Sequence, residues 1–473
     1  MSERSDDSAQ DLSGDDESFS PLGATAIVIG GSMAGLLAAR VLAEFFERVI
    51  VLDRDRLPAD PGARAGVPQA RHAHALLAGG LAVVERLFPK IGESLTRAGA
   101  TTIDWGSDFA VHAASGWMPR AASGIVTYGC SRDLLESFIR RTLASNSKIS
   151  FVDDSAVESL LPSSDGSRVQ GARVRSRAGR TRDIVGCDLV VDASGRGSHA
   201  PSWLASLGYD RPREIVVASH RAYATRWFAQ PSGARNWKAL LQSTWTPDVT
   251  RGGLIYPAEG DRWCVTLSGA EHHYPPVDAE GFLEFARRQP TSVLYEAIRS
   301  ARPISRIYGF RRLENRRRLF HHLARWPDRF VVMGDAACAF NPVFAQGMSV
   351  SARSAMALHA CLRNAQRRGS LAGATRRILG ALARTTAAPW FMTTVEDLRW
   401  AATEGATRRW YHRLAQRYLD RVSLLASSSA ESNRRSLEVW HLLRGPTALL
   451  HPSLSIEVLR TLLTKGVRPL SPA

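Results

Sequence analysis

A glycine-rich turn between an apolar strand and a helical segment constrains the fold of this chain more than any other feature. Residues 24–30 are apolar and rich in β-branched side chains, and the hexapeptide that follows, Gly30-Gly31-Ser32-Met33-Ala34-Gly35, opens a segment with helical spacing. A second apolar strand over residues 48–53 ends in Asp53. Residues 24–53 therefore have the length and pattern of one βαβ unit, which predicts an α/β protein with a Rossmann-like domain.

The turn carries the residue types that the pyrophosphate of a dinucleotide needs. A glycine permits the tight turn, a small residue allows close approach to phosphate, and a final glycine lets the helix pack on the strand. The helix N-terminus offers free amides to the phosphates, and Asp53 can accept hydrogen bonds from a ribose. Ser32 departs mildly from the usual second glycine, and a glycine turn in any α/β protein is the alternative. The cofactor contacts expected here are Gly30, Ser32, Ala34, Gly35, Asp53 and Arg54.

A second group of residues, about three hundred positions later, indicates which dinucleotide is bound. An apolar strand over residues 329–334 leads into Gly334-Asp335, followed by Asn341-Pro342 and Gln346-Gly347-Met348-Ser349. This order closely resembles the glycine–aspartate motif of flavin hydroxylases that share the para-hydroxybenzoate hydroxylase fold. The resemblance implies FAD as cofactor, with Asp335 on its ribityl chain and the helix after Gly347 and Met348 pointing its N-terminus at the flavin ring. Pro342 is a further contact that the resemblance implies.

Two other segments resemble motifs of the same family. Asp192-Ala-Ser-Gly195 is similar to an aspartate–glycine motif that contributes FAD and NADPH contacts, although a glycine-rich turn after a strand explains it equally well. Arg132 lies at an Arg-x-x-Leu helix start, with Ser131 as the expected N-cap. The resemblance places Arg132 near the FAD pyrophosphate, and the alternative is an ordinary exposed arginine.

A narrower resemblance concerns the reaction. Residues 66–74, 192–198 and 334–349 together are similar to the flavin-dependent polyene epoxidases of polyether pathways such as those of monensin and lasalocid. It implies epoxidation of an alkene in a bulky apolar secondary-metabolite intermediate by molecular oxygen through a flavin hydroperoxide. NADPH or NADH would be the reductant, directly or through a partner flavin reductase, and Arg71 and His72 would lie near the flavin ring.

Alternative functions stay open at this point. An aromatic-ring hydroxylase of the same fold would share every motif, and an alkene reductase resembling geranylgeranyl reductase would use reduced flavin without oxygen. The W-x-W-x-I-P signature of flavin halogenases is absent. A flavin-binding protein without catalysis, or a basic scaffold for nucleic acid, remains a further class.

Composition limits the partners and the location of the protein. The net charge of +16 would suit nucleic acid, but the basic residues are spread along the chain without a nucleic-acid motif, so we expect no such partner. Five cysteines without a C-x-x-C pair argue against zinc or disulfides, and His72 and His74 lack an evident third ligand, so no metal is expected. No apolar run approaches the roughly 20 residues that span a bilayer, and no secretory signal opens the sequence. We expect a cytoplasmic protein.

The pattern of elements predicts a discontinuous FAD-binding domain of the glutathione-reductase type with an inserted, mostly antiparallel substrate sheet and C-terminal helices. Hairpins are expected around residues 165–166 and 259–261, and a helix from about Ala75. The expected divisions are an acidic disordered tail over 1–21, the FAD-binding domain over 22–80, 126–210 and 326–372, the substrate domain over 81–125 and 211–325, and helices over 373–473.

Overall fold

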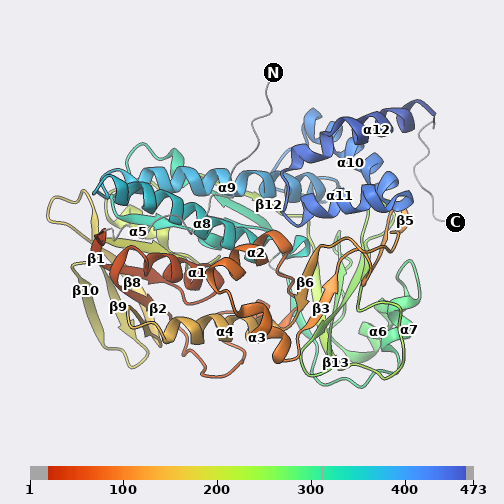
Figure 1. Ribbon diagram of the computed structural model, residues 1–473, viewed down its shortest axis with the longest axis horizontal. Helices are drawn as coiled ribbons and strands as arrows, with labels where there is room; N and C mark the ends of the chain where they lie inside the picture. The colour runs from red at the N-terminus through yellow and green to blue at the C-terminus, as the bar shows by residue number, and fades with distance from the viewer. Residues whose placement is uncertain (1–19, 312, 465–473) are drawn as a thin grey trace.

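The computed structural model describes residues 20–311 and 313–464 and has the α/β architecture that the sequence predicts (Figure 1). Its first sheet has five parallel strands in the order β19-β11-β1-β2-β7. The strands are β1 (Gly23–Ile29), β2 (Phe46–Leu52), β7 (Ile149–Val152), β11 (Leu189–Asp192) and β19 (Phe330–Val332). These bounds confirm the strands expected near residues 24–30, 48–53, 149–152, 187–192 and 329–334.

Side chains of β1 alternate between two cores on the two faces of this sheet, as the period of a strand requires. Ala26 and Val28 pack against the helices α1 (Met33–Leu42), α2 (Ala78–Leu87), α3 (Ile91–Arg97), α4 (Arg132–Ala144) and α8 (Gln346–Arg367). Ile27 and Ile29 pack against α5 (Ala200–Ser206) and against a small antiparallel sheet of β8 (Ser155–Pro162), β9 (Val169–Ser176) and β10 (Thr181–Val185). The hairpin expected at residues 165–166 joins β8 to β9.

A second large sheet has seven strands in the order β17-β13-β16-β15-β14-β4-β5, all antiparallel except the β14–β4 pair. The strands are β4 (Phe109–Ala113), β5 (Gly116–Trp117), β13 (Ala222–Ala229), β14 (Ala239–Gln242), β15 (Arg251–Ala258), β16 (Arg262–Gly269) and β17 (Tyr308–Phe310). Helices α6 (Ala279–Arg287) and α7 (Val293–Ile298) cover one of its faces. The predicted antiparallel sheet and the hairpin at 259–261 are confirmed.

Smaller elements connect the two sheets. A two-stranded ladder pairs β3 (Thr101–Asp104) with β6 (Val126–Gly129), and a three-stranded one has the order β12-β18-β20, with β12 (Glu214–Val217), β18 (Asn315–Arg318) and β20 (Cys338–Ala339). Short 3-10 turns are η1 (Pro68–Arg71), η2 (Phe320–His322), η3 (Gly334–Ala336), η4 (Pro342–Phe344) and η5 (Pro446–Leu450).

The last part of the described chain is helical, as predicted. Helix α9 (Ala374–Asp397) runs beside α8, and α10 (Trp410–Ser428), α11 (Ala430–Trp440) and α12 (Pro452–Thr464) gather at one end of the molecule (Figure 1). None of the helices in the described ranges is long and apolar enough to cross a membrane. Most of the acidic tail expected over 1–21 lies outside the described residues.

One predicted boundary is wrong. The helix expected from about Ala75 begins at Ala78, because Leu77 has extended backbone angles and its amide donates to the hydroxyl of Ser349 at 3.0 Å. This contact ties the preceding loop to the first turn of α8, and only a distant residue supplies it.

Candidate functional site

The glycine turn after β1 is as compact as the sequence predicts. Gly30 has φ +103°, and a Cβ on Gly35 would lie 1.7 Å from the carbonyl oxygen of Gly30. The amide of Gly31 donates to the Asp53 carboxylate at 2.7 Å. No side chain caps the first turn of α1, and that turn contains no acidic residue. Its amides therefore face outward from the turn in the way that suits an anionic ligand.

A buried ionic network that sequence reasoning missed lies beside this turn. Glu136 on α4 accepts from the Ser32 hydroxyl at 2.6 Å and from Arg132 Nε at 2.8 Å, and its second oxygen accepts from Arg64 Nη2 at 2.7 Å. Arg132 also donates to Ser32 Oγ at 2.8 Å. Burial by itself would raise the pKa of Glu136, but the two guanidinium groups and the Ser32 hydroxyl lower it to about 2. Glu136 is thus a fixed anion that orients two arginines beside the turn.

The spacing of Arg132 and Glu136 is the one signal in the sequence that could have indicated this network. Residues four apart on a helix lie on the same face and form ion pairs. Nothing comparable marks Arg64, which lies in the irregular segment before η1 and pairs with both Asp53 and Glu136. Asp53 therefore accepts from Arg64 and from the amides of Gly31 and Asp55, while Arg54 is exposed.

The second motif lies directly against the first. Gly334 in η3 has φ +62°, and a Cβ built on it would be 2.6 Å from the Cβ of Ala34. A Cβ on Gly347 would be 3.8 Å from Asp335 Oδ1, so the aspartate lies beside the first turn of α8. The side chain of Asp335 is about one third exposed, and its partner is Arg196 at 3.8 Å. The structure thus brings together two motifs that are far apart in the sequence.

The first turn of α8 resembles that of α1. Ala345 precedes it with φ +54°, no side chain caps it, and it contains no acidic residue. Pro342 begins η4 just before it, and Gly347 and Met348 lie in the turn itself. Because η3 adjoins Ala34 in the first turn of α1 and Gly347 in the first turn of α8, the two uncapped helix N-termini lie in one region of the molecule.

The predicted residue Asp192 ends β11 between β1 and β19, and its loop adjoins the first motif, because a Cβ on Gly30 would lie 2.6 Å from the Ala193 carbonyl oxygen. The carboxylate of Asp192 is fully buried and accepts from the Ser194 amide, the Ser194 hydroxyl and the Ser198 hydroxyl at 2.9, 2.6 and 2.5 Å. Gly195 has φ +81° and open space around its Cβ position. Asp192 therefore orders its own loop, and Arg196 is the side chain from this segment that reaches Asp335.

Arg71 and His72 are held against the seven-stranded sheet. The guanidinium of Arg71 lies 5.0 Å from the ring centre of Tyr308. The backbone carbonyl of Arg71 accepts a hydrogen bond from Trp227 Nε1 at 3.0 Å. His72 Nδ1 is 2.7 Å from Thr225 Oγ1, and burial followed by the charge of Arg71 lowers the pKa of His72 to about 4. Both residues connect the loop after η1 to β13 and β17.

His74 connects the same loop to the first motif. Its Nδ1 donates to the carbonyl of His72 at 2.9 Å, so Nε2 is the acceptor for Arg132 Nη1 at 3.3 Å. Burial and the charge of Arg132 lower its pKa to about 3, so the imidazole is neutral at physiological pH. No group of three or more potential metal ligands occurs in the described part of the chain.

A buried polar cluster, also missed from the sequence, anchors the segment before Pro342. Asp397, at the end of α9 and fully buried, accepts from Asn315 Nδ2 at 2.7 Å, from Asn341 Nδ2 at 2.9 Å and from the Ser219 hydroxyl at 2.8 Å. Arg221 Nε lies 3.6 Å from the same carboxylate. The C-terminal helices therefore take part in positioning η4.

Apolar side chains surround the region in front of α8. Two contacts bring α11 to this region: Gln346 Nε2 donates to the carbonyl of Trp440 at 3.2 Å, and the Gly79 amide donates to the carbonyl of His441 at 2.9 Å. Among the partly buried apolar side chains that pack against one core cluster there are Val111, Leu241, Leu254, Ala345, Leu437 and Trp440. We call these six side chains the apolar surround; they come from one face of the seven-stranded sheet, from the residue before α8 and from α11.

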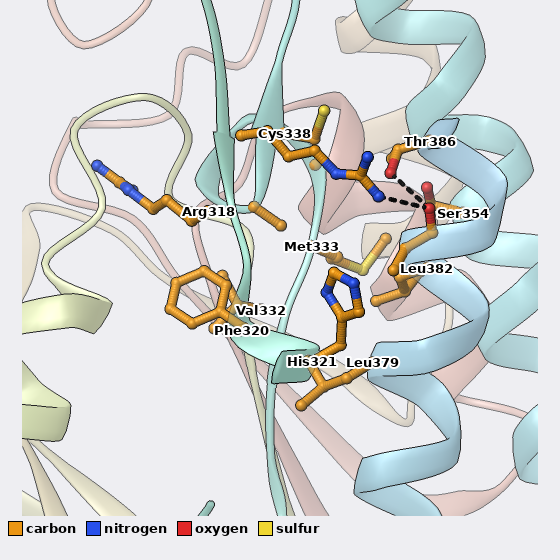
Figure 2. Close-up of a pocket in the computed structure, with 14 residues that line it drawn as sticks. Arg318, Phe320, His321, Val332, Met333, Cys338, Ser354, Leu379, Leu382 and Thr386 are labelled. Carbon is orange, nitrogen blue, oxygen red and sulfur yellow. Dashed lines mark hydrogen bonds between the residues drawn. The ribbon is translucent and has the colours of Figure 1, made fainter. Parts of the chain in front are cut away.

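A small cavity lies on another side of the second motif, between β18, α8 and α9 (Figure 2). Met333, Gly334 and Cys338 line it together with Leu382 and Thr386. Its volume of about 30 Å³ is enough for one or two water molecules and far below that of a flavin. Burial raises the pKa of the Cys338 thiol to about 12, so the thiol stays protonated.

The chain belongs to the family described as FAD binding domain, whose model matches residues 24–372. It is 33% identical over 397 residues to Protein Rv3254 of Mycobacterium tuberculosis, an alignment that covers 82% of this chain and 83% of that protein. Two solved structures share the fold. A triple mutant of the flavin-dependent brominase Bmp2 has TM-score 0.64 at 14% identity and covers 93% of this chain and 99% of its own. The p-nitrophenol 4-monooxygenase PnpA of Pseudomonas putida DLL-E4 has TM-score 0.63 at 18% identity, covering 89% and 99%.

The geometry fits the cofactor of this family. The uncapped turn of α1, with Arg132 beside it, suits a pyrophosphate, and the partly exposed Asp335 suits a ribityl chain. The glycine at position 334 leaves no room for a side chain where the two motifs meet. FAD therefore agrees with the residues on both sides of this contact.

Proposed function

We propose that the protein is an FAD-dependent monooxygenase that epoxidises an alkene bond of a bulky apolar intermediate. The contact between Ala34 and Gly334 carries this proposal, because it joins the two uncapped helix N-termini into one extended site beside the apolar surround. FAD, when bound, supplies the activation of oxygen, so the protein needs few reactive side chains of its own.

The residues of the chain would each have a limited role. Arg132 and the α1 amides would hold the pyrophosphate, and Asp335 would accept from the ribityl hydroxyls. The α8 amides next to Gly347 and Met348 would stabilise negative charge on the ring. Leu241, Leu254 and Trp440 would exclude water and position the substrate. Gly30, Gly35 and Pro342 would shape the backbone around the cofactor.

The low pKa values of the nearby histidines favour an alkene over a phenol as the substrate. Hydroxylation of a phenol gains from a base that removes the hydroxyl proton. Burial lowers the pKa of His441 to about 3; this residue packs on Trp105, in the core cluster against which the apolar surround lies. Burial and the charge of Arg71 lower the pKa of His72, which is held against β13, to about 4. Imidazoles with such values are weak bases, whereas epoxidation requires no deprotonation of the substrate.

Product analysis under labelled oxygen tests the proposal. The purified holoprotein would be given NADPH, ¹⁸O₂ and either an apolar linear triene or a phenol of similar size. One oxygen atom enters the alkene and the other leaves as water, while NADPH supplies two electrons. We expect labelled epoxide and triene-dependent oxygen consumption. Labelled hydroxylation of the phenol alone would assign the ring hydroxylase instead.

Control reactions address the remaining alternatives. Saturation of the triene without oxygen would identify an alkene reductase, and absence of any turnover with NADPH or with a chemical reductant would contradict an enzymatic function. A comparison of NADPH with an added flavin reductase shows whether reduction is direct.

A further inference from the structure

The N-terminal part of α10 carries a surface that the FAD site does not use. Trp410 and Leu414 are 74% and 62% exposed and lie one helical turn apart. Tyr411 and Phe391 are each 39% exposed, and the rings of both lie close to that of His412. We call this surface the α10 patch; it consists of Phe391, Trp410, Tyr411 and Leu414 together with Arg408, Arg409, Arg413 and Arg417.

The arginines of the α10 patch have no acidic partners. Within the described residues, no carboxylate forms an ion pair with any of these four arginines, and the nearby Glu404 and Asp420 pair with His220 and Arg399. Partial burial and the charges of Arg413, Arg399 and Arg417 lower the pKa of Arg408. Asp420 offsets this effect in part, so the mutual repulsion of these arginines is not fully relieved within the described residues.

The position of these charges on the helix is also unfavourable. A helix N-terminus carries partial positive charge, so arginines there destabilise the helix, and α10 has no acidic residue in its first turn. Exposed aromatic and leucine side chains add a further cost in water. An external anionic and apolar partner would remove both costs at once.

We propose that the α10 patch docks the protein on an anionic lipid bilayer. Trp and Tyr favour the boundary between headgroups and acyl chains, leucine enters the acyl region, and arginine binds anionic headgroups. A second copy would bring the same positive charge against the patch, and nucleic acid would leave Leu414 in water. Docking is independent of the reaction proposed above, and α10 would lie in the bilayer surface without crossing it.

Vesicle flotation with the FAD-loaded full chain tests this proposal. We expect binding to vesicles of phosphatidylglycerol mixed with phosphatidylcholine, weaker binding at high salt, and little binding to phosphatidylcholine alone. Each basic side chain near an anionic bilayer strengthens binding by a factor of about five, so the pair Arg413→Gln and Arg417→Gln should weaken it by about 25-fold. Trp410→Ala with Leu414→Ala should weaken binding without changing its salt dependence.

A matched control removes two exposed arginines at the opposite end of the molecule. Arg175 and Arg177 on the β9–β10 hairpin have side chains 57% and 86% exposed, and Figure 1 shows these strands far from α10. The pair Arg175→Gln and Arg177→Gln should retain nearly full binding, and retained FAD would show that each variant is folded. Equal losses in both arginine pairs, or no flotation of the unmodified protein, would overturn the proposal. If the unmodified protein forms a dimer in solution and the double variant Trp410→Ala with Leu414→Ala is monomeric, the membrane proposal is overturned and the α10 patch is a contact between two copies of the chain.

Discussion

Glu136 is a buried carboxylate that holds together three side chains beside the proposed pyrophosphate site. It is buried, and it fixes Ser32, Arg132 and Arg64 at hydrogen-bond distance on the side of α1 where the pyrophosphate is proposed. A buried carboxylate that balances two guanidinium groups makes those groups rigid and limits their repulsion. The network therefore couples the stability of the fold to the geometry of the site.

We predict that Glu136→Gln lowers the free energy of unfolding by about 3 kcal/mol, because it removes the buried counter-charge of Arg132 and leaves Arg64 with Asp53 as its remaining acidic partner. Urea unfolding of the FAD-free protein measures the change. Glu284→Gln is the matched control, since Glu284 also accepts from two arginines, Arg287 and Arg288, but at the surface. Equal effects of the two substitutions would contradict the importance of the buried network.

The same residue predicts a dependence of stability on pH. The pKa of Glu136 is lowered from 4.5 to about 2 in the folded state, so its contribution is present above pH 4.5 and is lost as the pH falls towards 2. The difference in unfolding free energy between the native chain and Glu136→Gln should therefore shrink over this interval. A difference that stays constant between pH 5 and 3 would show that the carboxylate is not selectively stabilised in the folded protein.

At the scale of elements, two contacts position the second motif. Gly334 meets the start of α1, and Asp397 at the end of α9 holds the amide of Asn341 next to η4. Local pattern predicted both the glycine turn and the α8 helix, because the residues that decide them are adjacent in the sequence. The Asp397 contact could not be predicted, since a single aspartate near the end of a helix carries no signal of its distant partner.

Substitution of Gly334 tests the contact between the motifs. Gly334→Ala should greatly weaken FAD binding, because its Cβ would lie 2.6 Å from the Cβ of Ala34. Gly166→Ala is the control, since Gly166 has φ +68°, similar to the +62° of Gly334, but open space around it. It should cost about 1 kcal/mol and retain FAD. Flavin content after gel filtration compares the two; equal retention would contradict the proposed junction.

We expect Asp397→Ala to destabilise the protein by about 3 kcal/mol and to speed the release of FAD. The change leaves the side-chain amides of Asn315 and Asn341 without their buried acceptor and removes the carboxylate that forms an ion pair with Arg221. Flavin fluorescence during dilution reports release, and urea unfolding reports stability. The control Glu404→Ala removes an exposed carboxylate nearby and should change neither the stability nor the rate of FAD release. An unchanged rate of FAD release in Asp397→Ala would show that this cluster does not position the cofactor site.

In the molecule as a whole, the C-terminal helices border the candidate site. Trp440 at the end of α11 contacts the start of α8, the C-cap residue His441 contacts the first turn of α2, and Asp397 reaches η4 from α9. The sequence predicted the five parallel strands, the antiparallel sheet and the C-terminal helices because apolar periodicity is local. It did not predict the role of α11 or the Arg64–Glu136 pair, because these contacts join segments without a shared pattern. The resemblance to flavin hydroxylases predicted site residues only within continuous motifs, and so it did not indicate these long-range contacts.

In the proposed complex, one FAD molecule contacts both motifs, with its pyrophosphate at Arg132 and its ribityl chain at Asp335. The most direct measurement is the binding of FAD and of riboflavin, which lacks the pyrophosphate, to the FAD-free chain and to two variants. Asp335→Ala should weaken both ligands by roughly 10- to 100-fold, while Arg132→Gln should weaken FAD by a similar factor and leave riboflavin nearly unchanged. Equal losses for both ligands in Arg132→Gln, or unaltered FAD binding in Asp335→Ala, would contradict this arrangement.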